Sequence, residues 1–239
     1  MSDDSRRRIL ARIRGIGGGR DAASIERELA ALGAAPGAPA PDEDPVTSFM
    51  CNVLRNHGSV DIAADRRAAV EAVGRYLYRE LRSHRLVAGN DPHLAAMPWR
   101  DGGVLPRFGT LENGEQAALS YAPWGIAETG ATVLVTGRYS PSSNHLLPVH
   151  HLVLVESANI LPDLEAFWQR SELPRGKRPR GISFVAGPSS TGDIEAKLVY
   201  GAHGPQAWHV IVMGEVAPDA LQRANELAGR AAQSIPQDA

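Results

Sequence analysis

The chain has 239 residues, of which 43% are hydrophobic, so it is long enough to bury the core of one α/β domain with extensions at its ends. Lysine and arginine (25) nearly balance aspartate and glutamate (27), and the net charge of −2 argues against the basic surface of a nucleic-acid-binding protein. The single cysteine, Cys51, excludes an internal disulfide and, within this chain, an iron–sulfur cluster or a cysteine-based zinc site.

The first ten residues, MSDDSRRRIL, lack the apolar stretch of a signal peptide. No apolar run in the chain approaches the length of a membrane-spanning helix. We therefore expect a cytoplasmic protein without a membrane span.

Two short helices are predicted at the N-terminus, over Ser5–Arg14 and Ser24–Leu32. Residues 33–41 form a run of proline, alanine and glycine that cannot bury a core and is typical of a linker. The sequence thus predicts a helical N-terminal arm with its linker over residues 1–43, and a globular domain over residues 44–239.

Helical and extended patterns alternate through the globular domain. The clearest helix is Arg66–Leu81, which has an apolar stripe at helical spacing. Further helices are predicted at Pro45–Asn56, Ile160–Gln169, Asp193–Tyr200 and Pro218–Ser234, with a short helical turn opened by Asp91 and Pro92. Strands are predicted at Ser59–Ile62, Arg85–Ala88, Ala117–Tyr121, Thr132–Thr136, His151–Val155, Ile182–Ala186 and Trp208–Met213, with a turn between the third and the fourth.

Strands separated by helices predict a three-layer α/β fold, with a mostly parallel sheet flanked by helices on both faces. Ligands of such folds gather at the carboxyl ends of the strands. We therefore expect the loops that follow Tyr121, Val135 and Ala186 to carry the function.

The loop after Ala186 is rich in small hydroxylated residues. Gly187 ends the strand, and Ser189, Ser190 and Thr191 offer hydroxyls and backbone N–H groups at the start of the predicted helix, an arrangement that suits an anion. Ser190 with Asp193 also fits a helix-capping pattern, and the charge of Asp193 opposes a bound anion. A ligand site and a helix cap remain equally good interpretations.

Two further loops carry groups that can move a proton. His203 lies between Gly201 and Gly204, so its backbone can approach a ligand closely, although a turn histidine bonded to backbone explains the pattern as well. Glu128 lies in the glycine-bordered loop Gly125–Gly130, where a carboxylate can act as acid, base or nucleophile, or can simply cap backbone groups.

Arg138 follows a predicted strand and can clamp a carboxylate with two hydrogen bonds, although most arginines are simply solvated. His145, His150 and His151 cluster in sequence without a recognised metal-ligand spacing, and neighbours on a strand point in opposite directions. We expect no metal site there. No glycine-rich dinucleotide fingerprint follows a strand, so a nicotinamide site is not predicted.

Five motifs occur in order between residues 125 and 205: GIAETG at Gly125–Gly130, Gly137-Arg138, Leu147-Pro148 with HLVLV at His151–Val155, GPSSTGDIE at Gly187–Glu195, and GAHGP at Gly201–Pro205. Together they resemble the LUD-domain proteins, and within that family the C-type subunit of the bacterial lactate-utilisation system. Ser190 and Gly192 stand where the family often has an arginine and an alanine, which weakens the expected grip of this loop on an anion.

The resemblance implies a fold of the NagB/RpiA/CoA-transferase type. It also implies a role in the oxidation of L-lactate to pyruvate, together with iron–sulfur subunits on separate chains. This chain is then expected to hold no cofactor of its own, with the iron–sulfur clusters on the partner subunits. The positions carried over from the family pattern are Glu128, Arg138, Ser189, Thr191, Asp193 and His203.

The first hypothesis is a pocket formed by the Glu128, Gly187 and His203 loops, which binds a small organic acid. Glu128 or His203 moves the proton, and the substrate-binding residues are Arg138, Gly187, Ser189, Ser190, Thr191, Asp193 and Gly204. Two alternatives remain open. One is a stand-alone enzyme like a CoA-transferase or ligase, with Glu128 as nucleophile. The other is a non-catalytic assembly or regulatory module.

Overall fold

The computed structural model describes residues 3–16, 21–32, 43–171, 179–194 and 197–233, and the chain divides into two compact units, Met1–Gly37 and Ala38–Ala239. The first unit contains α1 (Asp3–Ile16) and α2 (Ala22–Leu32), which confirms the two predicted N-terminal helices. The predicted linker over residues 33–41 lies outside the described residues. None of the described helices is long and apolar enough to cross a membrane.

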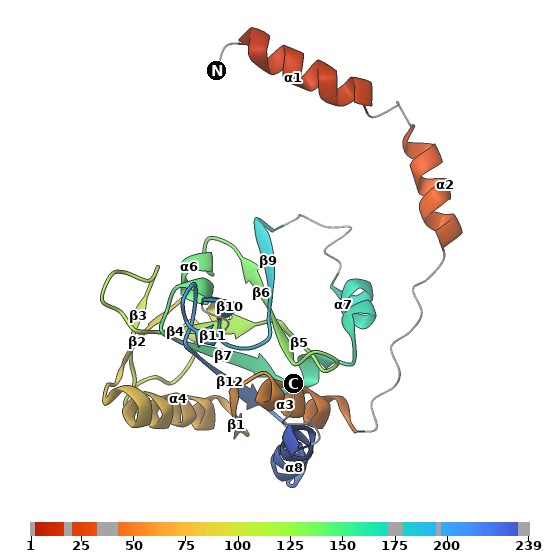
Figure 1. The fold of residues 1–239 in the computed structure, drawn as a ribbon. Helices are drawn as coiled ribbons and strands as arrows, with labels where there is room; N and C mark the ends of the chain where they lie inside the picture. The colour runs from red at the N-terminus through yellow and green to blue at the C-terminus, as the bar shows by residue number, and fades with distance from the viewer. Residues whose placement is uncertain (1–2, 17–20, 33–42, 172–178, 195–196, 234–239) are drawn as a thin grey trace. The chain divides into compact units, whose positions relative to one another are not determined.

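A parallel sheet forms the centre of the second unit (Figure 1). Every neighbouring pair in it is parallel, so the predicted mostly parallel sheet is confirmed. The edge strand β3 was not predicted, because its sequence, LPRF, is short and contains a proline. In spatial order the strands are β1 (Ser59–Ala63), β12 (Ala207–Met213), β7 (His150–Glu156), β4 (Ala117–Ala122), β2 (Arg85–Ala88) and β3 (Leu105–Phe108).

Alternating side chains give this sheet two apolar faces, as the geometry of a strand requires. In β12, Val210 and Val212 join the core on one face, and Ile211 joins the core on the other. The Ile211 face is covered by α4 (Arg66–Leu81) and α5 (Pro92–Ala95). The opposite face is covered by α3 (Pro45–Arg55), α8 (Ala220–Gln233) and a second sheet. The predicted three-layer α/β architecture is therefore confirmed.

Helix α4 begins and ends where the sequence predicts. The Asp65 side chain accepts a hydrogen bond from Ala68 N at 2.8 Å, which satisfies one of the free N–H groups of the first turn. The helix ends at Arg82, which adopts a left-handed conformation. Its buried stripe, which includes Val70, Val73 and Leu77, packs against the sheet.

The second sheet has the order β8 (Ile160–Leu161), β5 (Trp124–Ile126), β6 (Ala131–Thr136) and β9 (Gly181–Val185). The pairs β5–β6 and β6–β9 are antiparallel. The prediction that the strands at Ala117–Tyr121 and Thr132–Thr136 flank one turn is wrong, because they belong to different sheets and β5 lies between them. The rule on carboxyl ends of parallel strands therefore does not apply to the loops after β6 and β9.

The predicted helix Ile160–Gln169 is partly wrong. Ile160 and Leu161 are buried and pair with β5, after the short 3₁₀ helix η1 (Ser157–Asn159). Helix α7 (Leu164–Arg170) begins only after Asp163, whose carboxylate accepts from Ala166 N at 2.7 Å. It packs over the second sheet through the buried Phe167.

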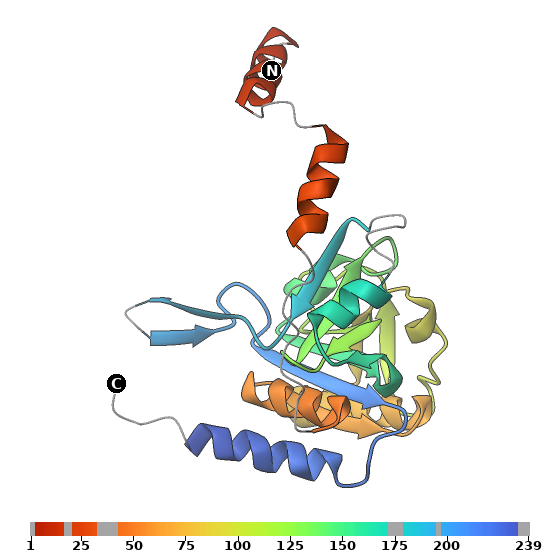
Figure 2. The ribbon, with the colours of Figure 1, turned by 90° about the vertical axis from the view of Figure 1, so that its right-hand side faces the viewer.

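The predicted helix Asp193–Tyr200 is wrong. The described part of this segment is an antiparallel hairpin of β10 (Ser190–Ile194) and β11 (Lys197–Tyr200), which forms a sheet of its own (Figure 2). Val199 pairs with Thr191, and β-branched residues in such cross-strand pairs favour strands. An apolar pair four apart over eight residues does not separate helix from strand. The helix N-terminus expected to hold an anion next to Ser190 and Thr191 therefore does not exist.

Candidate functional site

The Glu128 and Gly187 loops meet at the end of α3. The Asn56 side chain donates from Nδ2 to Thr129 O at 2.8 Å, and Asn52 Nδ2 donates to Ala127 O at 2.8 Å. Gly187 lies directly against Asn56. The structure thus brings together two of the three loops that the sequence predicts to form one pocket.

The third loop joins the second through backbone hydrogen bonds. Ser189 N donates to Pro205 O at 2.8 Å, and Gly201 N donates to Ser189 O at 2.8 Å. Gly204 packs against the Ser189 side chain, and Gly201, which follows β11, has a left-handed backbone conformation. Because these backbone groups bond to each other, they are not free to cradle an anion.

These loops lie at the amino edge of the parallel sheet. The chain runs from Pro205 directly into β12, and Gln206 N donates to Val149 O just before β7 begins. The expectation that the Gly187 loop stands at the carboxyl ends of the parallel strands is therefore wrong. Ser190, Thr191 and Asp193 lie on β10, and His203 is exposed.

Glu128 and Arg138 lie at opposite ends of β6. Since the six residues of β6 are separated by five rises of about 3.3 Å each, its ends are about 17 Å apart. Both side chains are exposed. Glu128 Oε2 accepts a long hydrogen bond of 3.5 Å from Leu164 N at the start of α7, and the Arg138 guanidinium lies over the Tyr139 ring at 5.6 Å.

A different site occurs at the carboxyl ends of β2 and β4. The chain leaves β2 past α5 towards the outer strand β3, whereas it leaves β4 through the second sheet towards β7 on the other side. Neighbouring strands whose connections run in opposite directions form a topological switch point, where open α/β sheets bind ligands. Strand β4 also extends beyond the last β2 pair, Ala88 with Leu119, which leaves a notch beside Ser120 and Tyr121.

A narrow cleft without room for a water-sized sphere occupies this notch. We call it the switch-point cleft. Gly89 is needed there, because a Cβ atom at this position would lie 2.4 Å from Tyr139 O. The backbone of the opposite wall thus approaches β2 closely. The lining residues are Gly89, Asp91, Leu94, Leu119, Ser120, Tyr121, Tyr139, Ser140, Pro141, Asn144 and His145.

One buried histidine, His145, lines the cleft, and a second, His151, lies beside it. His145 Nε2 pairs with Ser140 Oγ at 2.9 Å, and His151 Nε2 pairs with Ser120 Oγ at 3.0 Å. The two rings are 6.2 Å apart. Burial lowers the pKa of His145 to about 4 and that of His151 to about 3, so both imidazoles are neutral at pH 7. In the described part of the chain, neither Nδ1 atom has a hydrogen-bond partner.

His150 points away from this cluster. Its Nδ1 pairs with the Tyr76 hydroxyl at 3.0 Å on the face that α4 covers. The prediction that neighbouring histidines on this strand face opposite sides is confirmed. Among the described residues, no group of three or more His, Cys, Asp or Glu side chains is arranged to hold a metal ion.

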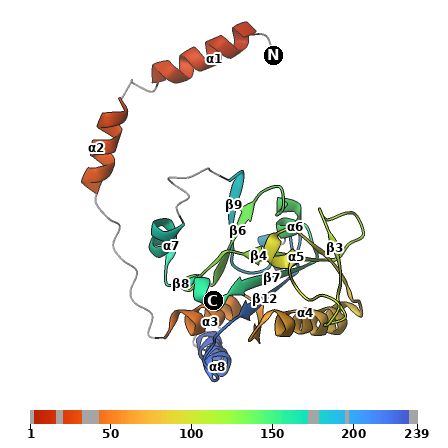
Figure 3. The same ribbon diagram turned by 180° about the vertical axis from the view of Figure 1, so that it is seen from behind.

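A histidine–aspartate pair stands at the other side of the cleft. His93 Nδ1 lies 2.9 Å from Asp91 Oδ1, which also accepts from His93 N at 2.8 Å. The His93 ring stacks on the Tyr121 ring at 3.9 Å with an interplanar angle of 4°. Burial raises the pKa of Tyr121 to about 12, so its hydroxyl stays protonated at neutral pH. Figure 3 shows α5, which begins with this pair, and α6 beside β4.

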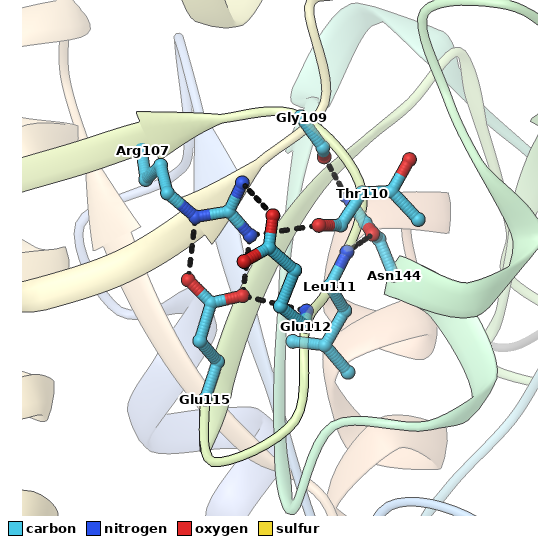
Figure 4. Close-up of polar contacts among 7 residues, drawn as sticks. All are labelled: Arg107, Gly109, Thr110, Leu111, Glu112, Glu115 and Asn144. Atoms are coloured by element: carbon cyan, nitrogen blue, oxygen red, sulfur yellow. Dashed lines mark hydrogen bonds and ion pairs between the residues drawn. The ribbon is translucent and has the colours of Figure 1, made fainter.

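The helix that carries His145 is fastened to the β3–β4 loop. Asn144 is buried in α6 (Ser142–Leu146); its Nδ2 donates to Gly109 O at 2.8 Å and its Oδ1 accepts from Leu111 N at 2.7 Å. Arg107 holds the same loop through a two-pronged ion pair with Glu115 (Figure 4). This network fixes the position of His145 relative to β4.

Two wider clefts lack such converging groups. One, of about 600 Å³, lies at the amino ends of β2, β3 and β4, and its Arg107 is already paired with Glu115. The other, of about 380 Å³, lies at the carboxyl ends of β1, β12 and β7, and its Asp65 already caps α4. Among the described residues, the unpaired buried imidazole of His145 distinguishes the smaller switch-point cleft from both.

A family model for the LUD domain matches residues 114–213. Residues 114–213 are a LUD domain. This confirms the family resemblance of the five motifs, all of which lie within the match. The LUD domain includes β4, Ser140, His145 and His151, whereas Gly89 and Asp91 on the opposite wall of the switch-point cleft precede it.

The LUD domain is similar to curated bacterial proteins. A protein of Halalkalibacterium halodurans named Lactate utilization protein C is 33% identical over 108 residues, which cover 43% of this chain and 47% of that protein. A protein of the same name from an Exiguobacterium species is 24% identical over 177 residues, which cover 70% of this chain and 76% of that protein. The chain spans about half the length, or less, of the first curated relatives that it matches.

Among solved structures, a DUF162 family protein from Deinococcus radiodurans aligns with a TM-score of 0.56 and 19% identity. The alignment covers 74% of this chain and 100% of that one, and it shows the shared fold.

The sequence interpretation missed Asp91, His93, Tyr121 and Ser140 as site residues, and it considered His145 only as a metal ligand. The available signal was the Asp91-Pro92-His93 helix start beside β2, which was assigned only a capping role. The contact of this turn with Tyr121 depends on β2 lying next to β4, which the local pattern does not reveal.

Proposed function

We propose that this protein acts in lactate utilisation. The observation that carries the proposal is the similarity of the LUD domain to bacterial proteins named Lactate utilization protein C. In finer terms, the chain is a subunit of a cytoplasmic system that oxidises L-lactate to pyruvate, and iron–sulfur proteins on separate chains accept the electrons.

The cysteine content of this chain supports placing the iron–sulfur clusters on separate chains. Iron–sulfur clusters are held by several cysteine thiolates, and the chain has one cysteine, which is buried in α3 against the apolar core. Burial also raises the pKa of the Cys51 thiol, which disfavours the thiolate form. This supports placing the iron–sulfur clusters of the proposed system on partner chains.

Reconstitution tests the proposal. The full chain is purified with the candidate iron–sulfur partners, and pyruvate formation from L-lactate is followed with an artificial electron acceptor. The expected result is turnover that needs both this chain and its partners. Turnover that is unchanged when this chain is omitted, or no lactate-linked turnover in any combination, contradicts the proposed function.

A further inference from the structure

We propose that α1 and α2 join two copies of this chain, with α1 of each copy packed antiparallel against α2 of the other. The inference does not rest on the proposed function, because both helices precede the LUD domain at residues 114–213. It concerns the unit Met1–Gly37 by itself.

The first argument is that each helix carries an apolar stripe that the described part of the chain leaves exposed. The stripe residues are Ile9, Leu10 and Ile13 in α1, and Ile25, Leu29 and Leu32 in α2. Leu29 is 59% exposed and Leu32 is 79% exposed, and α2 has no buried residue. In a folded protein such a stripe faces a core or another helix. Both stripes therefore lack the apolar surface that their spacing is suited to contact.

The second argument is the small size of the unit. A folded unit of fewer than about 40 residues usually needs a disulfide, a metal ion or oligomerisation for stability. Met1–Gly37 falls below this limit, and the one cysteine of the chain, Cys51, lies outside it. Among the described residues, no group of three or more His, Cys, Asp or Glu side chains is arranged for a metal ion. Of the three usual means, oligomerisation is the one that fits.

The third argument is that the two stripes have the same spacing. Ile9 and Ile13 are four residues apart in α1, as are Ile25 and Leu29 in α2. Leu32 continues the second stripe three residues later, which gives the repeat of a seam between two helices. An antiparallel pairing of α1 with α2 therefore places Ile13 opposite Ile25 and Ile9 opposite Leu29.

The fourth argument is the charge beside each stripe. Arg12 precedes Ile13 at a position that flanks such a seam, and Glu28 precedes Leu29 at the same position of α2. Antiparallel pairing of α1 with α2 brings Arg12 beside Glu28. Pairing of two like helices brings arginine beside arginine or glutamate beside glutamate, which is unfavourable. The charges therefore favour α1 against α2.

The same charges favour a second copy of this chain over a lipid surface. Helix α1 contains five arginines and two aspartates, whereas Glu26 and Glu28 flank the stripe of α2 on both sides. An anionic membrane attracts α1 but repels the flanks of α2. A second copy suits both helices, because each copy offers one basic and one acidic stripe, and two-fold symmetry forms the contact twice.

Sedimentation equilibrium of the purified full chain tests this inference. We expect particles of twice the monomer mass that dissociate on dilution. Ile13→Glu and Leu29→Glu place a charge in the seam, and each is expected to raise the dissociation constant of the dimer at least about tenfold. The controls Ala11→Glu and Ala30→Glu add the same charge at exposed positions on the opposite faces of the two helices, and they should leave this constant unchanged.

A charge exchange locates the contact. Arg12→Glu alone and Glu28→Arg alone are each expected to weaken the dimer several-fold, because each places like charges side by side. The double variant should recover most of the lost affinity. Recovery cannot result from unfolding of the arm, so this comparison still decides if the glutamates placed in the seam prevent the helices from forming.

Three outcomes overturn the inference. The first is a full chain that stays monomeric at high protein concentration, which means that the stripes pair within one chain or contact a different protein. The second is a dimer that neither seam variant nor the charge exchange affects. The third is a monomer that cosediments with vesicles containing phosphatidylglycerol, which assigns α1 to a membrane surface. The proposed function is tested separately, by lactate turnover.

Discussion

Gly187 and Asn56 touch through their backbones. A Cβ atom on Gly187 would lie 2.5 Å from Asn56 O, and Gly187 has a φ of 122°, which side chains disfavour. The same Asn56 donates its side-chain amide to Thr129 O. The end of α3 thereby connects two of the sequence motifs, and these contacts give both motifs a structural role.

This contact predicts that a methyl group added at Gly187 destabilises the fold. Gly187→Ala is expected to lower the free energy of unfolding by about 1–3 kcal/mol, because it combines backbone strain with a clash against backbone atoms that cannot move aside. Urea denaturation measures the change. Gly137→Ala is the matched control: nothing lies within 4 Å of its Cβ position, so an effect of under about 0.5 kcal/mol is expected.

Asn144 is predicted to stabilise the fold and the cleft together. Asn144→Ala removes two hydrogen bonds from a buried side chain and leaves Gly109 O and Leu111 N without their partner, so we expect a loss of about 2 kcal/mol in the free energy of unfolding. Hydrogen exchange of the Leu111 amide should accelerate. The exposed Asn90→Ala provides the control. An unchanged exchange rate at Leu111 contradicts the anchoring role of Asn144.

Glu128 tests the transferase alternative. Its exposed carboxylate accepts from Leu164 N at the start of α7, so mass spectrometry after incubation with a panel of acyl-CoA compounds is expected to show no adduct at Glu128. An adduct on this side chain that is lost in Glu128→Gln contradicts this expectation and supports the transferase alternative.

The layers of the fold were predictable because hydrophobic periodicity reports burial directly. The stripe of α4 and the apolar runs of β7 and β12 are long enough to distinguish helix from strand. The segment from Asp193 to Tyr200 is too short for this distinction, because its apolar spacing fits both a helix and a strand. The pairing of Val199 with Thr191 across the two strands favours the strand.

The site was less predictable than the fold. Asp91 and Tyr121 are thirty positions apart in sequence, and they meet because β2 inserts between β3 and β4. A parallel crossover can place the next strand at several positions in a sheet, so local patterns do not determine that neighbour. The motifs that identified the family include glycines such as Gly187 and Gly204, whose close backbone contacts explain their residue type without a ligand.

Three buried histidines predict how stability depends on pH. Burial lowers the pKa of His145 from 6.5 to about 4, and those of His151 and His209 to about 3. Below pH 6.5 the unfolded chain binds protons at these residues and the folded chain does not. The free energy of unfolding is therefore highest above pH 6.5 and falls as the pH decreases towards the folded pKa values.

The expected loss by pH 5 is on the order of 2 kcal/mol for each of these histidines, since one pKa unit corresponds to about 1.4 kcal/mol. The pKa values of Asp44 and Glu115 lie below their ordinary values of 3.8 and 4.5, so both carboxylates stay ionised and contribute little above pH 5. Urea denaturation between pH 7.5 and pH 5 measures the slope. His209→Gln should make the slope shallower, whatever its effect on stability at pH 7.5. A flat profile in the wild-type protein contradicts the assignment of neutral, buried histidines.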